Sequence, residues 1–188
     1  NYITDPPDNI AIVAVNDPNP TGELAYLRKY DWVHGRAPFS IEAGSDRLKL
    51  GSKEVRVLHD RDPARLPWGD LGVDLVLECT GHFTERAGSA KHIDAGAKRV
   101  AISAPSPDAD LTVVLGVNES AYDPAKHTII SNASCTTNAL APAAKVLNDS
   151  FGVERLMATA IHAYTATQAL VDRATKKPRR GRAAAVSL

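Results

Sequence analysis

The sequence predicts an α/β fold built on a doubly wound, parallel sheet. Short β-branched apolar runs alternate with segments of helical periodicity along the chain, an order typical of βαβ units. Most of these runs end at turn-forming residues, as strands buried in a parallel sheet do. Because ligands of such sheets bind beyond the carboxyl ends of the strands, the polar residues after each run are the first candidates for a site.

Strands are expected at five apolar runs: Ile10–Val15, Val73–Glu78, Arg99–Ser103, Leu111–Val117 and Thr128–Ser131. Two further strand-like segments, Arg47–Leu50 and Glu54–Leu58, are separated by Gly51-Ser52 and predict a hairpin.

Helices are expected at three segments between the strands: Gly22–Tyr30, Thr84–Ala95 and 136–151. The second should begin with Thr84 as its N-cap and end just before Gly96, and the third should end at Gly152. After it, Arg155–Tyr164 predicts a strand in a different environment, and the stretch beyond predicts a loop.

The bulk composition is that of a globular protein with one domain or somewhat more. The chain has 188 residues, 44% of them hydrophobic and 23% charged. Its 22 basic and 22 acidic residues cancel, so we expect no nucleic-acid partner. No apolar run approaches the roughly 18 residues needed to cross a bilayer, so no membrane partner is expected. Two cysteines are too few for a disulfide scaffold and fit a reducing, cytoplasmic setting.

Positive charge is concentrated in one stretch, residues 173–182, which contains six basic and no acidic residues. The simplest interpretation is a solvated loop. The alternatives are a nucleic-acid or localisation patch, and a loop that meets anionic ligands or other subunits.

Cys135 is the first candidate for chemistry. It lies in a polar run, SNASCTTN at 131–138, at or near the start of the third predicted helix. The partial positive charge of a helix start favours a thiolate, and its unpaired amides can hold an oxyanion or a phosphate. A small buried cysteine beside a polar cap is the alternative, and helix position alone favours that alternative.

His162 follows an apolar run at 157–161. A cysteine with a histidine elsewhere in the chain is a known pairing of nucleophile and base, but a core histidine is the commoner case. Thr165 and Thr167 alternate after it, so on a strand both hydroxyls would face one side. Such a pair suits a phosphate, and the β-propensity of threonine explains it equally well.

Other polar residues directly follow predicted strands and would share one crevice with Cys135 in a doubly wound sheet: Asp17, Thr80, Gly81 and Ser103. Asp17 has the type of an acid that binds ribose hydroxyls, but no glycine-rich turn precedes it. Taken alone, an Asn-Asp-Pro turn explains Asp17 better.

Several segments resemble the phosphorylating glyceraldehyde-3-phosphate dehydrogenase family. SNASCTTNALAP at 131–142 is similar to the family's long, specific cysteine signature, and IHAYTATQ at 161–168 to its histidine segment. Further similar segments follow in family order: VAVNDP at 13–18, KYDWVHGR at 29–36, ECTGHF at 78–83, ISAPS at 102–106 and RRGRAAAV at 179–186.

The resemblance implies a Rossmann-type dinucleotide-binding domain over residues 1–134, truncated at its first strand. It also implies the start of an α+β catalytic domain over residues 135–188, likewise incomplete. Residues 164–188 resemble a loop that meets a neighbouring subunit in the family's homotetramer.

The resemblance implies that Cys135 attacks the aldehyde of glyceraldehyde 3-phosphate to form a thiohemiacetal, with His162 as the base. Oxidation by NAD(P) would give a thioester, which inorganic phosphate cleaves to 1,3-bisphosphoglycerate in glycolysis or gluconeogenesis. The residues that flank the cysteine, Ser134 and Thr136, would bind one phosphate. The other phosphate would be bound by Thr165 and Thr167, and the cofactor by Asn16, Asp17, Thr80, Gly81 and Ser103; no metal is implied.

The chain also departs from the family pattern. The family's first strand, its glycine-rich turn and most of the catalytic domain, with the arginine that completes the substrate phosphate site, have no counterpart here, so we expect an internal part of a longer protein. Ala139 stands where the family often has a second cysteine, which should not stop catalysis.

NAD is the expected cofactor, with NADP or dual use as the alternative. Asp17 favours NAD because a carboxylate repels the 2′-phosphate of NADP. Asp172, however, is followed by Arg173-Ala174, where NAD-specific members usually carry Leu-Pro or Gly-Pro.

Two alternative functions are compatible with the sequence. An erythrose-4-phosphate dehydrogenase shares the cysteine motif but is less similar after the histidine. A non-catalytic protein that binds RNA or a regulatory partner through the basic stretch would not need the cysteine.

Residues 1–188 on their own are expected to bind cofactor poorly and to turn over little or nothing. The family's glycine-rich phosphate turn and the arginine that completes its substrate phosphate site are not among them. A kinetic assay of the purified chain with NAD, aldehyde and phosphate measures this. Turnover at the rate of an ordinary dehydrogenase, about 10 per second or more, would contradict the expectation.

Overall fold

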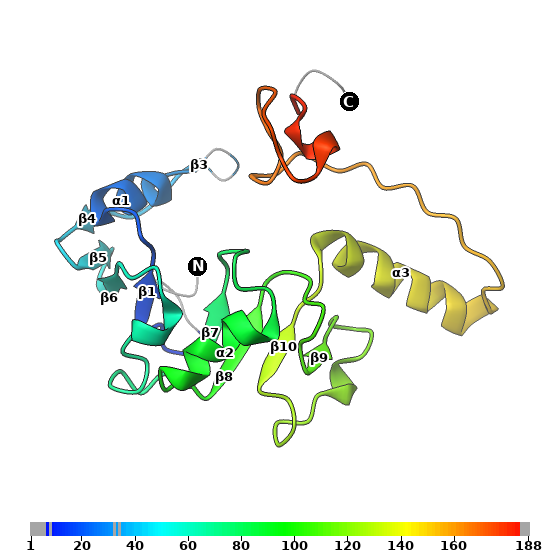
Figure 1. The fold of residues 1–188 in the computed structure, drawn as a ribbon, viewed down its shortest axis with the longest axis horizontal. Coiled ribbons are helices and arrows are strands. Elements are labelled where there is room, and N and C mark those ends of the chain that lie inside the picture. Colours follow the sequence, from blue (N-terminus) through cyan, green and yellow to red (C-terminus); the bar gives the residue numbers. More distant parts are fainter. Residues whose placement is uncertain (1–6, 8, 32, 34, 185–188) are drawn as a thin grey trace. The chain divides into compact units, whose positions relative to one another are not determined.

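The computed structural model describes residues 7, 9–31, 33 and 35–184. The chain divides into two compact units, Asn1–Val146 and Leu147–Leu188, and each is described by itself. The strands belong to the first unit (Figure 1). No helix among the described residues has the length and apolar character needed to cross a membrane. Some predicted features lie outside the described residues. They are positions 32, 34 and 185–186 of the family-like segments, positions 187–188 of the loop expected to meet a neighbouring subunit, and most of residues 1–9.

The first sheet has four strands in the spatial order β1 (Ala14–Asn16), β6 (Lys53–Leu58), β5 (Arg47–Leu50) and β4 (Ile41–Ala43). β1 is parallel to β6, whereas β4, β5 and β6 are antiparallel. The predicted hairpin is confirmed, and Gly51 makes its turn with a φ of 62°, which suits glycine. Helix α1 (Thr21–Lys29) covers this sheet, and its Ala25 is buried with Leu48, Val55 and Val57.

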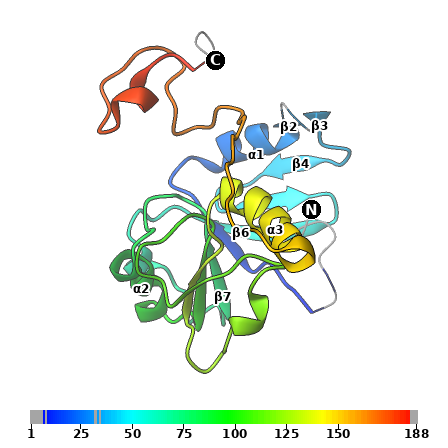
Figure 2. The same cartoon turned by 90° about the vertical axis from the view of Figure 1, so that its right-hand side faces the viewer.

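The second sheet is parallel throughout, in the order β7 (Leu75–Glu78), β8 (Arg99–Ile102), β10 (Ile129–Ser131) and β9 (Leu111–Thr112). Helix α2 (Arg86–Asp94) packs against β8. It lies to one side of this sheet, in which β7 is labelled in Figure 2. The core of this part is made of buried apolar side chains: Leu66, Trp68, Val76, Ala97, Val100, Ile102 and Ile129.

Shorter elements complete the described chain: the antiparallel pair β2 (Tyr30–Asp31) and β3 (Gly35–Arg36), and the 3-10 helices η1 (Pro63–Arg65), η2 (Glu119–Ala121) and η3 (Pro178–Gly181). The long helix α3 (Cys135–Phe151) ends where predicted, because Gly152 adopts a φ of 69° and its N–H bonds to the carbonyl of Asn148 at 2.9 Å.

The predicted fold class is confirmed, but its sheet is divided in two. β1 and β7 lie at the edges of their sheets, and no described strand pairs with both of them. The two parts still share apolar contacts, since Ala14 of β1 and Leu58 of β6 pack against the core of the second sheet. The division therefore interrupts the hydrogen-bond ladder and leaves the packing continuous.

Two predicted strands were longer than the strands observed. The run Ile10–Val15 becomes a strand only from Ala14. The run Leu111–Val117 is a strand only as far as Thr112. The Asn118 side chain forms hydrogen bonds with backbone groups that a longer strand would pair with its neighbour. Asn118 Oδ1 accepts the N–H of Val114 at 2.8 Å, and its Nδ2 donates to the Thr112 carbonyl at 2.9 Å.

The start of the second predicted helix was also wrong. Glu85, not Thr84, is the N-cap residue, and its side chain makes no capping bond. The carboxylate of Asp108 instead accepts the N–H of Arg86 at 2.7 Å from 22 positions along the chain. A carboxylate at a helix start satisfies an unpaired amide and suits the helix dipole, so a distant loop supplies the cap.

The predicted strand at Arg155–Tyr164 does not form. A strand needs a neighbour to pair its backbone groups, and no described segment lies in register with this one. Its apolar side chains are exposed, with Met157 at 95% and Ile161 at 101%. Local β-propensity alone was therefore a poor guide.

Residues 169–184 of the second unit form a loop closed by backbone bonds. The N–H of Ala169 donates to Arg180 O at 3.0 Å, that of Arg173 to Gly181 O at 2.8 Å, and that of Ala184 to Ala169 O at 2.8 Å. Ala169 is buried at the centre of this closure. The predicted loop character of the basic stretch is confirmed.

Gly96→Ala is expected to destabilise the first unit. Gly96 has a φ of +100°, and an added Cβ would lie 2.6 Å from both Cα and N of Gly69. The strained φ and the backbone overlap should together lower the free energy of unfolding by roughly 2–4 kcal/mol. Urea denaturation followed by circular dichroism measures the change.

Gly22→Ala is the matched control. A Cβ at Gly22 meets nothing within 4 Å, and alanine favours a helix by up to about 1 kcal/mol over glycine. This variant should be as stable as the parent or more so. If Gly96→Ala were equally stable, the close approach of Gly96 and Gly69 would not matter to the fold.

Candidate active site

The turns after β7, β8 and β10 emerge at one edge of the second sheet. The strands are parallel neighbours in which Glu78 pairs with Ile102 and Ile102 with Ser131. Two bonds continue this alignment beyond the strands: the N–H of Ser103 donates to Glu78 O at 3.0 Å, and that of Asn132 to Ile102 O at 2.9 Å. The predicted residues Thr80, Gly81, Ser103 and Cys135 are thereby brought to the same edge.

The turn from β10 into α3 is held by side-chain bonds. Ser131 is fully buried; its hydroxyl donates to Ala104 O at 2.7 Å and accepts the N–H of Ala133 at 3.0 Å. Ala133 has a φ of 58°, a left-handed conformation that is uncommon for a residue with a Cβ. The Asn138 amide donates to Asn132 O at 2.7 Å and to Ser134 O at 2.9 Å.

Cys135 is the first residue of α3, as predicted, and its thiol is exposed. Ser134 acts as the cap, since its Oγ accepts the N–H of Thr137 at 3.0 Å. The Cys135 thiol therefore sits at the positive end of the helix dipole, which favours an anionic sulfur. Of the two predicted phosphate ligands here, Thr136 is exposed and the Ser134 hydroxyl shares a bond of 2.7 Å with Thr137 Oγ1.

The turn after β7 rests on the buried carboxylate of Glu78, which is 3% exposed. One oxygen, Oε1, accepts the N–H of Thr80 at 2.7 Å and the hydroxyl of Thr80 in a short bond. The other, Oε2, lies 3.0 Å from Nε2 of His92. Burial by itself would raise the pKa of Glu78, but the bonds from His92 and Thr80 outweigh it and hold that pKa below its ordinary value.

Gly81 completes this turn with a φ of 71°. A Cβ added at Gly81 would point into open space, so the glycine is required by the backbone conformation and leaves the chain accessible from outside.

Asp17 lies directly after β1, at the end of the first sheet. Its N–H donates to Leu58 O, and both the N–H and the Nδ2 of Asn19 donate to its Oδ1, each at 2.9 Å. His59 donates from Nδ1 to the Asp17 carbonyl at 2.8 Å, because a carbonyl can only accept. The carboxylate is thus fixed through one oxygen, and no described hydrogen bond engages the other, Oδ2.

Asn16 has a structural partner. Its Nδ2 donates to Asp60 O at 2.9 Å and its Oδ1 accepts the N–H of Asp60 at 3.0 Å. The side chain therefore joins the end of β1 to the segment after β6. A contact between Asn16 and a cofactor stays a prediction.

His162 belongs to the second unit and is exposed. Its Nδ1 lies 2.5 Å from the carbonyl of Ala163 and must carry a proton to donate to it. In a neutral imidazole this leaves the lone pair on Nε2, the atom able to act as a base.

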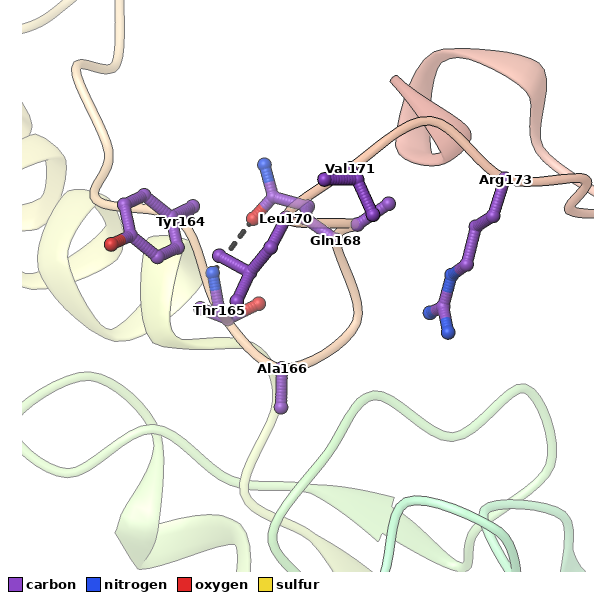
Figure 3. A pocket seen from close by; sticks show the side chains of 8 residues that line it. Tyr164, Thr165, Ala166, Gln168, Leu170, Val171 and Arg173 are labelled. Carbon is purple, nitrogen blue, oxygen red and sulfur yellow. Dashed lines mark hydrogen bonds between the residues drawn. The ribbon is translucent and has the colours of Figure 1, made fainter. Parts of the chain in front are cut away.

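The two predicted phosphate-binding threonines lie close together in the second unit. Thr165 Oγ1 and Thr167 Oγ1 are 3.1 Å apart, and Nη1 of Arg180 donates to Thr167 Oγ1 at 2.6 Å. Beside them is a pocket of about 470 Å³, where Gln168 Oε1 accepts the N–H of Thr165 at 2.8 Å (Figure 3). The sequence prediction did not include Arg180, although its place in the basic stretch was a signal for it.

Cys135 belongs to the first unit, and His162, Thr165 and Thr167 to the second. Their assembly into one catalytic centre therefore stays a prediction. The buried residues Glu78, His92 and Trp68 were missed by the sequence analysis. The available signal was Glu78 itself, a charged residue in phase with the buried positions of an apolar strand.

Comparison with known families decides the assignment. The family profile described as "Glyceraldehyde 3-phosphate dehydrogenase, NAD binding domain" matches residues 2–86. A second profile, "Glyceraldehyde 3-phosphate dehydrogenase, C-terminal domain", matches residues 134–188.

The chain belongs to the glyceraldehyde-3-phosphate dehydrogenase family. The predicted resemblance is confirmed, and so is NAD as the cofactor of its first domain. The residues fit that cofactor, because Asp17 Oδ2 and the accessible Gly81 backbone are groups that a dinucleotide can use. The described residues hold no group of three or more His, Cys, Asp or Glu side chains suited to a metal ion.

Similar curated proteins include glyceraldehyde-3-phosphate dehydrogenases of three bacteria. The Priestia megaterium protein is 51% identical over 181 residues, which are 96% of this chain and 54% of that protein. The Geobacillus stearothermophilus protein is 52% identical over 180 residues, again 96% and 54%. Glyceraldehyde-3-phosphate dehydrogenase 1 of Bacillus subtilis is 51% identical over 179 residues, 95% and 53%. The chain thus spans about half the length of the curated relatives it matches.

Acid should destabilise the first unit. Burial would raise the pKa of both Glu78 and Asp110, but hydrogen bonds outweigh it. They hold the pKa of Glu78 below its ordinary 4.5, and bonds from Ile129 and Thr128 hold that of Asp110 below 3.8. A carboxyl whose folded pKa is depressed contributes stability above its unfolded pKa, and loses it as the pH falls through the folded value. The urea midpoint should therefore be steady above about pH 5 and decline below about pH 4.5.

Urea titrations between pH 3 and pH 7 measure this dependence. Glu78→Gln removes one titrating group and should flatten part of the decline. A midpoint that rises on acidification would show that these carboxylates do not stabilise the folded chain.

Proposed function

We propose that this chain takes part in the NAD-dependent, phosphorylating oxidation of glyceraldehyde 3-phosphate to 1,3-bisphosphoglycerate, a step of glycolysis and gluconeogenesis. The observation that carries the proposal is the position of Cys135. It is an exposed thiol at the first residue of α3, at the sheet edge shared by Thr80, Gly81 and Ser103. Family membership supports the same reaction.

Cys135 is the proposed nucleophile. His162 takes the proton of the thiol, and the resulting thiolate attacks the aldehyde carbon. A C–S bond forms as the C=O π bond breaks, and the carbonyl oxygen takes up that proton to become the hydroxyl of a thiohemiacetal. Backbone amides at the start of α3 are suited to hold the developing oxyanion. Bound NAD would supply the hydride acceptor for oxidation of that carbon, and Cys135 would then hold the product as a thioester. Inorganic phosphate then attacks the thioester carbon, and the sulfur departs as a thiolate.

His162 is the proposed base. Nε2 takes the proton of the thiohemiacetal hydroxyl as the carbon is oxidised. The bond from Nδ1 to Ala163 O supports this role, because it keeps the proton on Nδ1 and the lone pair on Nε2.

The phosphate groups have two proposed sites. Ser134 and Thr136 flank the nucleophile at the helix start, where amides and hydroxyls favour an anion. Thr165 and Thr167 form the second site. Arg180 supports that assignment, since its guanidinium already lies against Thr167 and carries the positive charge that a phosphate needs.

The cofactor groove is assigned to Asn16, Asp17, Thr80, Gly81 and Ser103. Asp17 supports NAD over NADP, because its fixed carboxylate would repel a 2′-phosphate. The sequence Asp172-Arg173-Ala174 keeps NADP or dual use as the alternative. The Asp172 carboxylate itself accepts the N–H of Ala183 at 2.8 Å and pairs with Arg182 at 2.8 Å.

We infer that the dinucleotide-binding domain comprises residues 1–134 and that the catalytic domain begins at Cys135. The match of the C-terminal family profile from residue 134 supports this boundary. We further infer a cytoplasmic homotetramer, in which the closed loop of the second unit meets a neighbouring subunit.

Cys135→Ser and His162→Asn test the proposal in the full-length protein. Cys135→Ser should abolish NADH formation from glyceraldehyde 3-phosphate and phosphate, because the thiolate is the nucleophile. His162→Asn should lower kcat roughly 10²–10⁴-fold, the usual contribution of a general base. Absorbance at the NADH maximum measures both, and erythrose 4-phosphate in place of the triose tests the nearest alternative substrate.

Cys79→Ser is the matched control, since Cys79 is the other exposed thiol. It should retain activity, and iodoacetamide should inactivate both this variant and the parent protein. Full activity of Cys135→Ser would overturn the proposal, as would NAD binding with no turnover on either aldehyde.

A further inference from the structure

A buried polar chain runs from the core to the turn after β7. It begins at Trp68, whose indole Nε1 donates to Nδ1 of His92 at 3.0 Å. It continues from Nε2 of His92 to Oε2 of Glu78 at 3.0 Å, and from Oε1 of Glu78 to Thr80. Trp68, His92 and Glu78 are 5%, 4% and 3% exposed, so water does not compete for the bonds among these three residues.

The indole N–H of Trp68, at one end of this series of hydrogen bonds, determines which nitrogen of His92 carries the proton. An indole N–H can only donate, so Nδ1 of His92 must carry a lone pair. The imidazole is therefore neutral with its proton on Nε2, and that proton points to Glu78. A protonated His92 would turn a second N–H toward the indole N–H of Trp68. Glu78 in consequence receives a donor on Oε2 and is held as a carboxylate in one orientation.

The same carboxylate determines the direction of the Thr80 hydroxyl. That hydroxyl has one proton, which it donates to Glu78 Oε1. Its oxygen also accepts the N–H of His82 at 3.1 Å. Thr80 Oγ1 therefore has no proton left for a ligand, and its place in the groove is structural. The turn offers a ligand its backbone, not this hydroxyl.

We propose that Glu78, fixed by the buried His92–Trp68 pair, is a positioning residue that sets the Thr80–Gly81 turn for NAD binding. The inference rests on the proposed function only in taking NAD as the ligand of this edge. Glu78 at the end of β7 accepts three bonds, two from Thr80 in the turn and one from His92 in α2, and so joins these segments into one rigid unit. Gly81 lies at the outer end of this unit with a φ of 71°. Loss of a donor or of the charge would let the turn move without disturbing Cys135.

The test measures NAD binding and turnover in the full-length enzyme. Glu78→Gln replaces an acceptor oxygen by an amide donor that faces the donors of Thr80 or His92. Thr80→Val keeps the shape of an exposed side chain and removes the hydroxyl, so its folding is not in question. Each variant should raise the Kd and KM for NAD about tenfold, with kcat at saturating NAD and the KM for the aldehyde within about twofold.

Thr80→Ser restores the hydroxyl and should return the NAD affinity to within about twofold of the parent. Asp110→Asn is the matched control for a carboxylate network away from the site. Asp110 accepts the N–H groups of Thr128 and Ile129 at 2.9 Å, at the amino ends of β9 and β10. This variant should lose stability and keep its Kd for NAD.

The outcomes separate the two hypotheses. If the parent enzyme binds NAD and Thr80→Val binds it equally well, the positioning role is overturned and the proposed function stands. An equal loss of NAD affinity in Asp110→Asn would also overturn the positioning role, because general destabilisation of the fold would then explain the effect. If the parent protein binds no NAD at all, the proposed function falls and this inference falls with it.

Discussion

The parallel register of β7, β8 and β10 is the constraint on which the candidate site depends. Three chain segments leave the sheet at one level because Glu78, Ile102 and Ser131 lie side by side. A slip of one residue would turn each strand's buried side chains to the opposite face and shift the turn after it. The position of the Cys135 sulfur is therefore set by apolar contacts of residues that never meet a ligand: Val76, Val100 and Ile129.

Elements with strong local signals could be predicted from the sequence. Glycines at positions of positive φ marked the β5–β6 hairpin and the ends of α2 and α3, and each marker is intrinsic to the residue. The errors came where side-chain bonds, or contacts distant in the sequence, decided the structure. Asp108 caps α2 from a distant loop, and the Asn118 side chain accepts a backbone N–H that a longer β9 would pair within the sheet. Arg155–Tyr164 has no strand to pair with among the described residues.

The residues of the candidate site likewise differ in whether the sequence could predict them. Cys135 could be located from the sequence because a helix start has a local signature of polar residues before an amphipathic run. The chain of Trp68, His92 and Glu78 could not, since its members are 24 and 14 positions apart and each has an ordinary structural explanation alone. Only the fold reveals that hydrogen bonds connect them. The pairing of Cys135 with His162 depends in turn on family resemblance, because the two residues belong to different units.

The left-handed backbone of Ala133 has a consequence for how this protein would lose activity. A residue with a Cβ in that conformation costs roughly 1–2 kcal/mol relative to an ordinary one. The surrounding bonds of Ser131 and Asn138 hold it in place, two positions before the sulfur. Because only a few bonds hold this conformation, we expect it to relax on warming before the sheet unfolds. We therefore expect thermal inactivation at lower temperatures than global unfolding, with the loss confined to the geometry of the nucleophile.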